Sequence, residues 1–190
     1  HTKSGEWPRY KGFSLDGKVI GLLGLGAIGK ETAIRLSGFG CKILAYDLYP
    51  DEKFAAEQGI DLVLMDEILT TADIVSLHLP GTPETKEIVN KKFLSRMKDG
   101  AWLVNTARGD LINEDDLIMA LKEGKLRGAA LDVYPVEPPD PDNPLLKMDQ
   151  VITTPHMGAH ADSATNAMGR MALKECLSVL KGLEPEFQVS

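Results

Sequence analysis

A glycine-rich run constrains the fold of this chain more than any other feature of the sequence. The run reads Gly24-Leu25-Gly26-Ala27-Ile28-Gly29, and it directly follows the apolar stretch Val19–Leu23. An apolar strand, a glycine turn and a helix start in this order are typical of the first βα unit of a nucleotide-binding sheet. At this spacing Gly24 allows the tight turn, Gly26 lets a pyrophosphate approach the backbone, and Gly29 lets the helix pack closely on the sheet. The run therefore predicts a dinucleotide site, with the phosphates at the N-terminus of the helix.

An acidic residue, Asp47, follows the next apolar stretch, Lys42–Tyr46. A carboxylate at the end of the second strand can accept hydrogen bonds from both hydroxyls of an adenosine ribose. It would also repel the 2′-phosphate of NADP, because the two groups carry the same charge. The glycine run and Asp47 together predict that the cofactor is NAD.

Apolar stretches that are typical of strands alternate with helical stretches along the chain, which is the pattern of a parallel sheet covered on both faces. The sequence therefore predicts an α/β fold: a Rossmann-type, doubly wound parallel sheet of about seven strands in three αβα layers. The expected strands are Val19–Leu23, Lys42–Tyr46, Asp61–Leu64, Ile74–Leu77, Ala101–Asn105, Gly128–Asp132 and Val151–Thr153. The expected helices lie near Ala27–Phe39, Glu52–Gln58, Glu67–Thr70, Lys91–Met97, Glu114–Glu123 and Ala161–Leu180.

Charge and cysteine content narrow the class of function. The formal net charge is −7 and no basic cluster occurs, which argues against nucleic acid as a partner. No apolar run approaches the length of a membrane span, so no membrane partner is expected. The only two cysteines, Cys41 and Cys176, form no disulfide framework, which favours a cytoplasmic location. No metal site is predicted. An anionic substrate would need locally placed cations in such an acidic chain.

Polar residues follow three successive expected strands, where ligands of an open parallel sheet bind. Arg108 follows Ala101–Asn105, and Asp132 and Glu137 follow the next strand. His156 follows the last strand, Val151–Thr153. We expect these side chains to lie at the same edge of the sheet as the glycine turn.

These residue types suit hydride transfer to a 2-oxo acid. The guanidinium of Arg108 can bind a carboxylate through two hydrogen bonds and polarise the carbonyl group. His156 can donate the proton, because the pKa of histidine lies nearest neutrality. Glu137 beside it would favour the imidazolium and fix its orientation. Asp132 is expected to face the nicotinamide carboxamide or ribose. The structural alternatives are a loop-closing arginine, a solvated carboxylate and a surface histidine.

Several further motifs occur in one order along the chain, and together they resemble the NAD-binding domain of the D-isomer-specific 2-hydroxyacid dehydrogenases. The similarity is greatest to phosphoglycerate dehydrogenases, and it spans most of residues 12–182. The motifs are the glycine run, His78-Leu79-Pro80 with Thr82-Pro83-Glu84-Thr85, Asn105-Thr106-Ala107-Arg108-Gly109, Ala130-Leu131-Asp132-Val133-Tyr134 with Glu137-Pro138, and Thr154-Pro155-His156-Met157-Gly158-Ala159.

The resemblance implies site residues, activity and assembly. It assigns the catalytic roles to Arg108, Glu137 and His156, and the activity to an NAD-dependent dehydrogenase acting on a small 2-hydroxy or 2-oxo acid. It also implies a homodimer. The cofactor contacts it implies are Gly24, Gly26, Ala27, Ile28, Gly29, Asp47, Leu79, Pro80, Thr106, Asp132 and Gly158.

The chain departs from the family pattern in two places. The segment His160-Ala161-Asp162 stands where a hydroxyl-rich segment usually follows the histidine motif. The chain also begins at His1 rather than at methionine, and the substrate domain that precedes this region in the family is not in this sequence. We therefore expect residues 1–17 to be a crossover, 18–182 to be the NAD-binding domain, and 183–190 to begin the return to the substrate domain. Alone, the chain should bind NAD but turn over substrate poorly.

Two other functions fit part of this pattern. A corepressor-type binding module can carry the same fold and the same three residues, and would use NAD to control partner recognition. A methyltransferase also uses a glycine turn and a ribose-binding acid, but that hypothesis leaves Arg108, Glu137 and His156 unexplained. The sequence leaves the substrate open among phosphoglycerate, lactate, glycerate and hydroxypyruvate.

Overall fold

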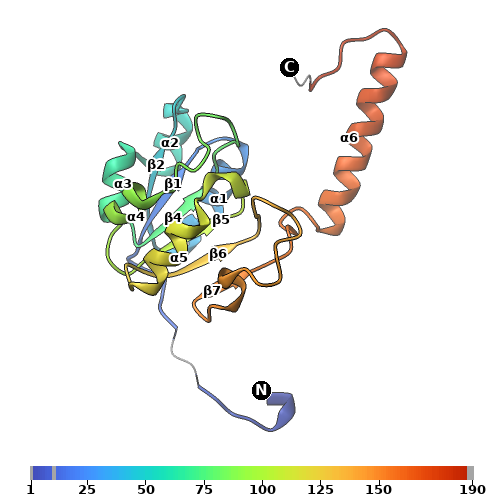
Figure 1. Cartoon of the computed structure of the whole chain (residues 1–190). Helices are drawn as coiled ribbons and strands as arrows, with labels where there is room; N and C mark the ends of the chain where they lie inside the picture. The colour runs from blue at the N-terminus through green and yellow to red at the C-terminus, as the bar shows by residue number, and fades with distance from the viewer. Residues whose placement is uncertain (1, 10–11, 188–190) are drawn as a thin grey trace. The chain divides into compact units, whose positions relative to one another are not determined.

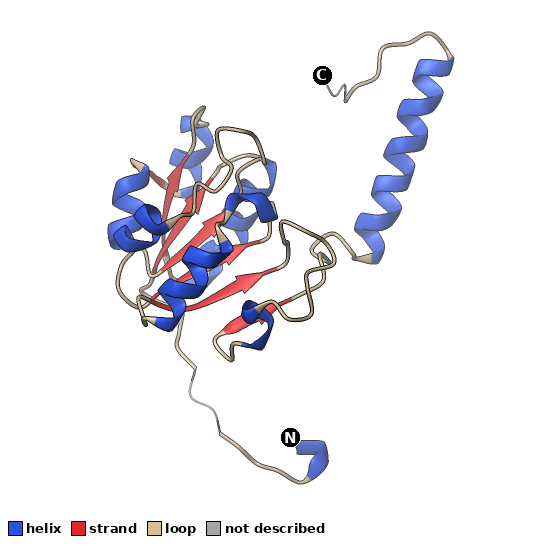
Figure 2. Ribbon diagram, viewed as in Figure 1, coloured by secondary structure: helices blue, strands red, loops and turns tan. Residues whose placement is uncertain are grey.

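The structure is a computed structural model that describes residues 2–9 and 12–187. It divides into two compact units, His1–Thr153 and Thr154–Ser190. In the part of the chain that the structure describes, all the strands belong to the first unit, and a long helix makes up most of the second (Figures 1 and 2).

The first unit alternates strands and helices as the sequence predicts. Its strands are β1 (Val19–Leu23), β2 (Lys42–Tyr46), β3 (Asp61–Leu62), β4 (Ile74–Leu77), β5 (Ala101–Asn105), β6 (Leu126–Leu131) and β7 (Val151–Thr153). Its α-helices are α1 (Ala27–Leu36), α2 (Glu52–Gln58), α3 (Met65–Thr71), α4 (Lys91–Arg96) and α5 (Glu114–Lys122). Short 3₁₀ helices occupy Thr2–Ser4, Ser37–Phe39, Gly109–Leu111 and Pro144–Lys147.

The seven strands form one parallel sheet in the order β3-β2-β1-β4-β5-β6-β7. The chain builds outward from β1 to β3 and then crosses over to β4, which pairs with β1 on its other side. This reversal is the topological switch point, where doubly wound sheets bind their ligands. The predicted Rossmann-type fold is confirmed. The carboxyl ends of β1, β2, β4, β5 and β6 form one edge of the sheet, and it is this edge that carries the candidate site.

Several predicted boundaries were wrong by one to a few residues. The third strand ends at Leu62 rather than Leu64, because the exposed Leu64 serves as the N-cap of α3. The sixth strand begins at the buried Leu126 rather than Gly128, and it ends before Asp132. The first helix ends at Leu36 and continues to Phe39 only as a 3₁₀ turn.

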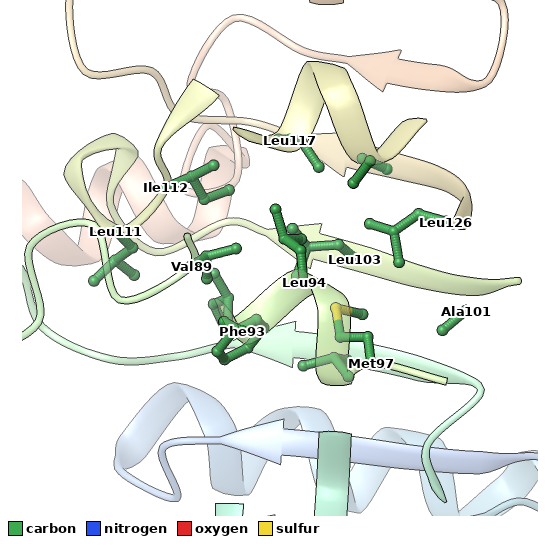
Figure 3. Close-up of a cluster of buried hydrophobic side chains, with 14 of the residues drawn as sticks. Val89, Phe93, Leu94, Met97, Ala101, Leu103, Leu111, Ile112, Leu117 and Leu126 are labelled. Atoms are coloured by element: carbon green, nitrogen blue, oxygen red, sulfur yellow. The ribbon is translucent and has the colours of Figure 1, made fainter. Parts of the chain in front are cut away.

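Alternate residues of the strands pack into two cores on opposite faces of the sheet. One core joins Leu23, Leu77 and Leu103 to the apolar faces of α3, α4 and α5. Figure 3 shows part of it, with Phe93 and Leu94 of α4, and Met97 directly after this helix, gathered near Leu103 of β5. The other core joins Ile20 and Leu22 of β1 to α1 and α2. Helices on both faces give the predicted three layers.

The second unit contains α6 (Asp162–Leu180), none of whose residues is buried. Its N-cap, Ala161, makes no side-chain capping hydrogen bond, as a residue without a side-chain acceptor must. Exposed apolar side chains lie along the helix at Met168, Met171, Leu173 and Leu177. Within residues 2–9 and 12–187, no helix has both the length and the apolar character that a membrane span needs.

Candidate functional site

The three glycines of the turn after β1 meet three different requirements. Gly24 has φ +100°, and an ideal Cβ there would lie 2.6 Å from the carbonyl oxygen of His78. A Cβ on Gly29 would lie 2.3 Å from the carbonyl oxygen of Gly24, so the start of α1 packs directly on the turn. Around Gly26, by contrast, no atom lies within 4 Å of an added Cβ. The structure thus has open space beside Gly26, where a pyrophosphate would approach the backbone.

The N-terminus of α1 faces this open space. Gly26 is the N-cap, and Ala27 and Ile28 are exposed in the first turn. The first N–H groups of a helix have no acceptor within the helix, and they attract anions. These residues fit the phosphates of a dinucleotide, as the sequence predicts.

Asp47 lies directly beside the glycine turn. Its Oδ2 accepts a hydrogen bond of 2.6 Å from the backbone N–H of Leu25, and its Oδ1 accepts one of 2.9 Å from the N–H of Tyr49. Both carboxylate oxygens are therefore oriented by the backbone, and each retains a lone pair for a ribose hydroxyl. A cavity beside Asp47, lined by Pro50, Leu62, Leu64 and Glu67 among others, has a volume of about 430 Å³.

The segment after β4 packs against the glycine turn. The backbone N–H of His78 donates to the carbonyl oxygen of Leu23, and its Nε2 lies 3.0 Å from the Oγ of Ser76. Burial lowers the pKa of His78. Leu79 packs against the larger core, whereas Pro80 is exposed and its carbonyl oxygen accepts a hydrogen bond from the hydroxyl of Thr85.

Arg108 leaves a turn that the side chain of Asn105 holds together. The Oδ1 of Asn105 accepts from the N–H of Ala107 at 3.0 Å, and its Nδ2 donates to the carbonyl oxygen of Arg108 at 2.8 Å. Thr106, in the same turn, is exposed. The Arg108 side chain runs past Gly81, where a Cβ would lie 3.2 Å from its Cγ, and its Nη1 donates to the carbonyl oxygen of Ala107.

Glu137 belongs to the loop after β6, which packs on the Arg108 turn. Its Oε1 accepts a hydrogen bond of 3.1 Å from the N–H of Tyr134. The N–H of Asp132 donates to the carbonyl oxygen of Asn105, and Asp132 is only 5% exposed. Burial, together with the charges of Asp132 and Glu137, raises the pKa of Tyr134. The structure therefore brings Arg108, Asp132 and Glu137 to neighbouring loops at the same edge of the sheet.

His156 and Gly158 belong to the second unit. His156 has φ +49° and follows Pro155, and both His156 and Gly158 are exposed within that unit. Their roles, and those of the residues above, stay predictions. In the described part of the chain, no group of three or more His, Cys, Asp and Glu side chains could hold a metal ion.

Two residues of the site had no role in the sequence-based prediction, although both stand in its motifs. Asn105 is fully buried, and Gly109 lies against the backbone of Tyr134. A polar residue at the end of an apolar strand is a signal that could have identified Asn105. Nothing in the sequence around Gly109 indicates its contact with a loop after another strand.

Known proteins share this arrangement. A family model described as the D-isomer specific 2-hydroxyacid dehydrogenase NAD-binding domain matches residues 1–158. D-3-phosphoglycerate dehydrogenase of Methanocaldococcus jannaschii is 45% identical over 183 residues, which are 95% of this chain and 35% of that protein. Glyoxylate reductase of Thermofilum pendens is 41% identical, over 96% of this chain and 56% of that protein.

Solved structures agree with these matches. D-lactate dehydrogenase of Lactobacillus jensenii, solved with NAD+, superposes with a TM-score of 0.87 at 30% identity, over 100% of this chain and 61% of that one. The chain thus spans between about a third and three fifths of the length of these proteins. The family model matches residues 1–158, and the sequence is 45% identical to that of a family member. The chain therefore belongs to the D-isomer specific 2-hydroxyacid dehydrogenase family and carries its NAD-binding domain.

Proposed function

We propose that the chain is the cofactor-binding domain of an NAD-dependent oxidoreductase that interconverts a D-2-hydroxy acid and its 2-oxo acid. The observation that carries this proposal is the packing of the Arg108 turn on the loop of Glu137, at the sheet edge that also holds the glycine turn. A cation and a carboxylate are thereby available beside a dinucleotide site. The names of the relatives support the same class of substrate, because they are dehydrogenases and reductases of 2-hydroxy and 2-oxo acids.

Bound NAD supplies the hydride acceptor or donor for C2 of the substrate. Arg108 binds the substrate carboxylate through two hydrogen bonds and polarises the adjacent carbonyl. His156 donates a proton to the carbonyl oxygen during reduction and accepts it from the hydroxyl during oxidation. The family resemblance assigns to Glu137 the role of stabilising the protonated imidazole. Reduction thus delivers one hydride to carbon and one proton to oxygen.

The cofactor half of the proposal is tested on the chain itself. Titration with NADH, followed by nicotinamide fluorescence, should give saturable binding, and a chain that binds no NADH would contradict the proposal. Alone, the chain should oxidise 2-hydroxy acids poorly, since the resemblance implies that a separate substrate domain forms the other wall of the cleft. Robust turnover by the chain alone would overturn that second expectation.

The catalytic half is tested in the full-length protein, assayed with a panel of 2-oxo acids of the phosphoglycerate, glyoxylate and hydroxypyruvate type. His156→Ala should remove turnover and leave NADH binding nearly intact. Retained turnover would rule out His156 as the proton donor.

The family membership removes the methyltransferase hypothesis, and the enzyme names of the relatives give no support to the corepressor alternative. We also propose that the protein works in the cytoplasm as a homodimer. The family resemblance supports the dimer, as do the exposed apolar side chains of α6. Sedimentation at several concentrations tests the dimer.

A further inference from the structure

The few buried polar side chains of this structure lie close to one another at the sheet edge that carries the candidate site. Among the described residues they are Ser76, Asn105 and Asp132. Ser76 lies in β4, Asn105 ends β5, and Asp132 follows β6, so all three lie near the carboxyl ends of three neighbouring strands. Burying a polar group is costly unless its hydrogen bonds are made, so such a group indicates a local requirement.

Asn105 is the most deeply buried of the three, with an exposure of 0%. Its side chain makes one hydrogen bond to the N–H of Ala107 and one to the carbonyl oxygen of Arg108. Its own carbonyl oxygen accepts from the N–H of Asp132. One side chain and one carbonyl group thus join the turn after β5 to the first residue after β6.

We propose that Asn105 is a positioning residue for the nicotinamide end of the cofactor site, an inference that rests on the proposed function. Its side chain holds the turn of Thr106, Ala107 and Arg108, in which the family resemblance assigns Thr106 to the cofactor and Arg108 to the substrate. The bond to Asp132 is made by the backbone carbonyl of Asn105 and does not depend on its side chain. The Asn105 side chain acts through the backbone of the turn. Its amide supplies both a donor and an acceptor within the turn, and a carboxylate, hydroxyl or alkyl side chain does not supply both in the same geometry.

The adenosine end of the site lies on other strands. Gly24 and Gly26 follow β1, Asp47 follows β2, and the hydrogen bonds of Asn105 reach none of them. Loss of the Asn105 amide should therefore weaken binding of the nicotinamide half of the cofactor and leave binding of the ADP-ribose half unchanged. General damage to the fold would weaken both.

The test compares two ligands by calorimetry on the whole chain: NADH, and ADP-ribose, which lacks the nicotinamide ring. For Asn105→Ala we expect the affinity for NADH to fall about tenfold while the affinity for ADP-ribose stays within about twofold. Asn90→Ala is the matched control. Asn90 also bonds backbone groups through its side chain, at the N-terminus of α4, and its loss should leave both affinities unchanged.

Four outcomes would overturn the inference: a parallel fall in both affinities, no fall in either, the same effect from Asn90→Ala, or equal affinity of the unmodified chain for NADH and ADP-ribose. Failure of the unmodified chain to bind either ligand would instead contradict the proposed function. If Asn105→Ala does not fold, Asn105→Asp retains the acceptor for the N–H of Ala107 and replaces the donor to the carbonyl oxygen of Arg108 by a charged carboxylate oxygen.

A measurement on the unmodified chain decides the question if neither variant folds. NADH should slow amide hydrogen exchange at Ala107 and Asp132, whose N–H groups bond to Asn105, more than ADP-ribose does. Equal protection by the two ligands would overturn the inference.

Discussion

Gly109 lies so close to Tyr134 that an ideal Cβ on Gly109 would come within 2.0 Å of the Tyr134 carbonyl carbon. Gly109 directly follows Arg108, and the N–H of Tyr134 donates to the carboxylate of Glu137. The loops that carry the two candidate catalytic side chains therefore meet backbone to backbone. The relative placement of Arg108 and Glu137 depends on the absence of one methyl group.

Gly109→Ala should therefore force the two loops apart. We expect the free energy of unfolding to fall by roughly 1–3 kcal/mol, as in other overpacked interiors, and urea denaturation measures this. Gly38→Ala is the control, because a Cβ there meets nothing within 4 Å. Equal stability of the two variants would contradict the close contact.

Gly26→Ala should leave the stability of the chain nearly unchanged and weaken NADH binding. Open space surrounds this position and its φ is −70°, so alanine fits the unliganded chain and should change its stability by no more than about 0.5 kcal/mol. The added methyl group would occupy the approach to the pyrophosphate, so the affinity for NADH should fall at least about tenfold. Calorimetry and urea denaturation of the same variant check both parts. Unchanged NADH affinity would show that the phosphates bind elsewhere.

The sheet and the cofactor turn could be predicted from sequence because their signals are local. Apolar stretches that alternate with helical stretches indicate the strands. The spacing of Gly24, Gly26 and Gly29 indicates the turn, because the close contact of Gly29 with Gly24 joins residues near each other in sequence. The contact of Asp47 with Leu25 was also predictable, because an acid at the end of β2 faces the turn after β1 in this topology.

The supporting contacts were not predictable, because they join residues on different strands. The backbone of Tyr134 leaves no room for a side chain at Gly109. The N–H of Asp132 donates a hydrogen bond to the carbonyl oxygen of Asn105. No periodicity or spacing expresses such pairs. Strand ends were misplaced for a related reason: Leu64 is apolar but caps α3 in an exposed position, so hydrophobicity alone extends the third strand too far.

Asp47→Asn should change the choice between NADH and NADPH. The amide retains an acceptor for the N–H of Leu25, gives up the acceptor for the N–H of Tyr49, and loses the negative charge that repels a 2′-phosphate. Two unit charges at 4 Å repel by about 1–4 kcal/mol near a protein surface, so the ratio of NADH to NADPH affinity should fall by about tenfold or more. Asp61→Asn, at an exposed acid of β3, is the charge-matched control. A ratio that falls equally in both variants would rule out Asp47 as the discriminating group.

The half-buried His78 should make the stability of the chain depend on pH. Burial lowers its pKa in the folded state, whereas the unfolded chain keeps the ordinary value of about 6.5. As the pH falls through about 6.5, the unfolded chain takes up the proton first, so the free energy of unfolding decreases by up to about 1.4 kcal/mol per pH unit until the folded-state pKa is reached. The contribution is fully present above pH of about 7. His78→Gln should flatten the urea-denaturation profile between about pH 7 and 5, whereas His160→Gln, at an exposed position, should leave it unchanged. An unaltered slope in His78→Gln would show that His78 is not the group responsible.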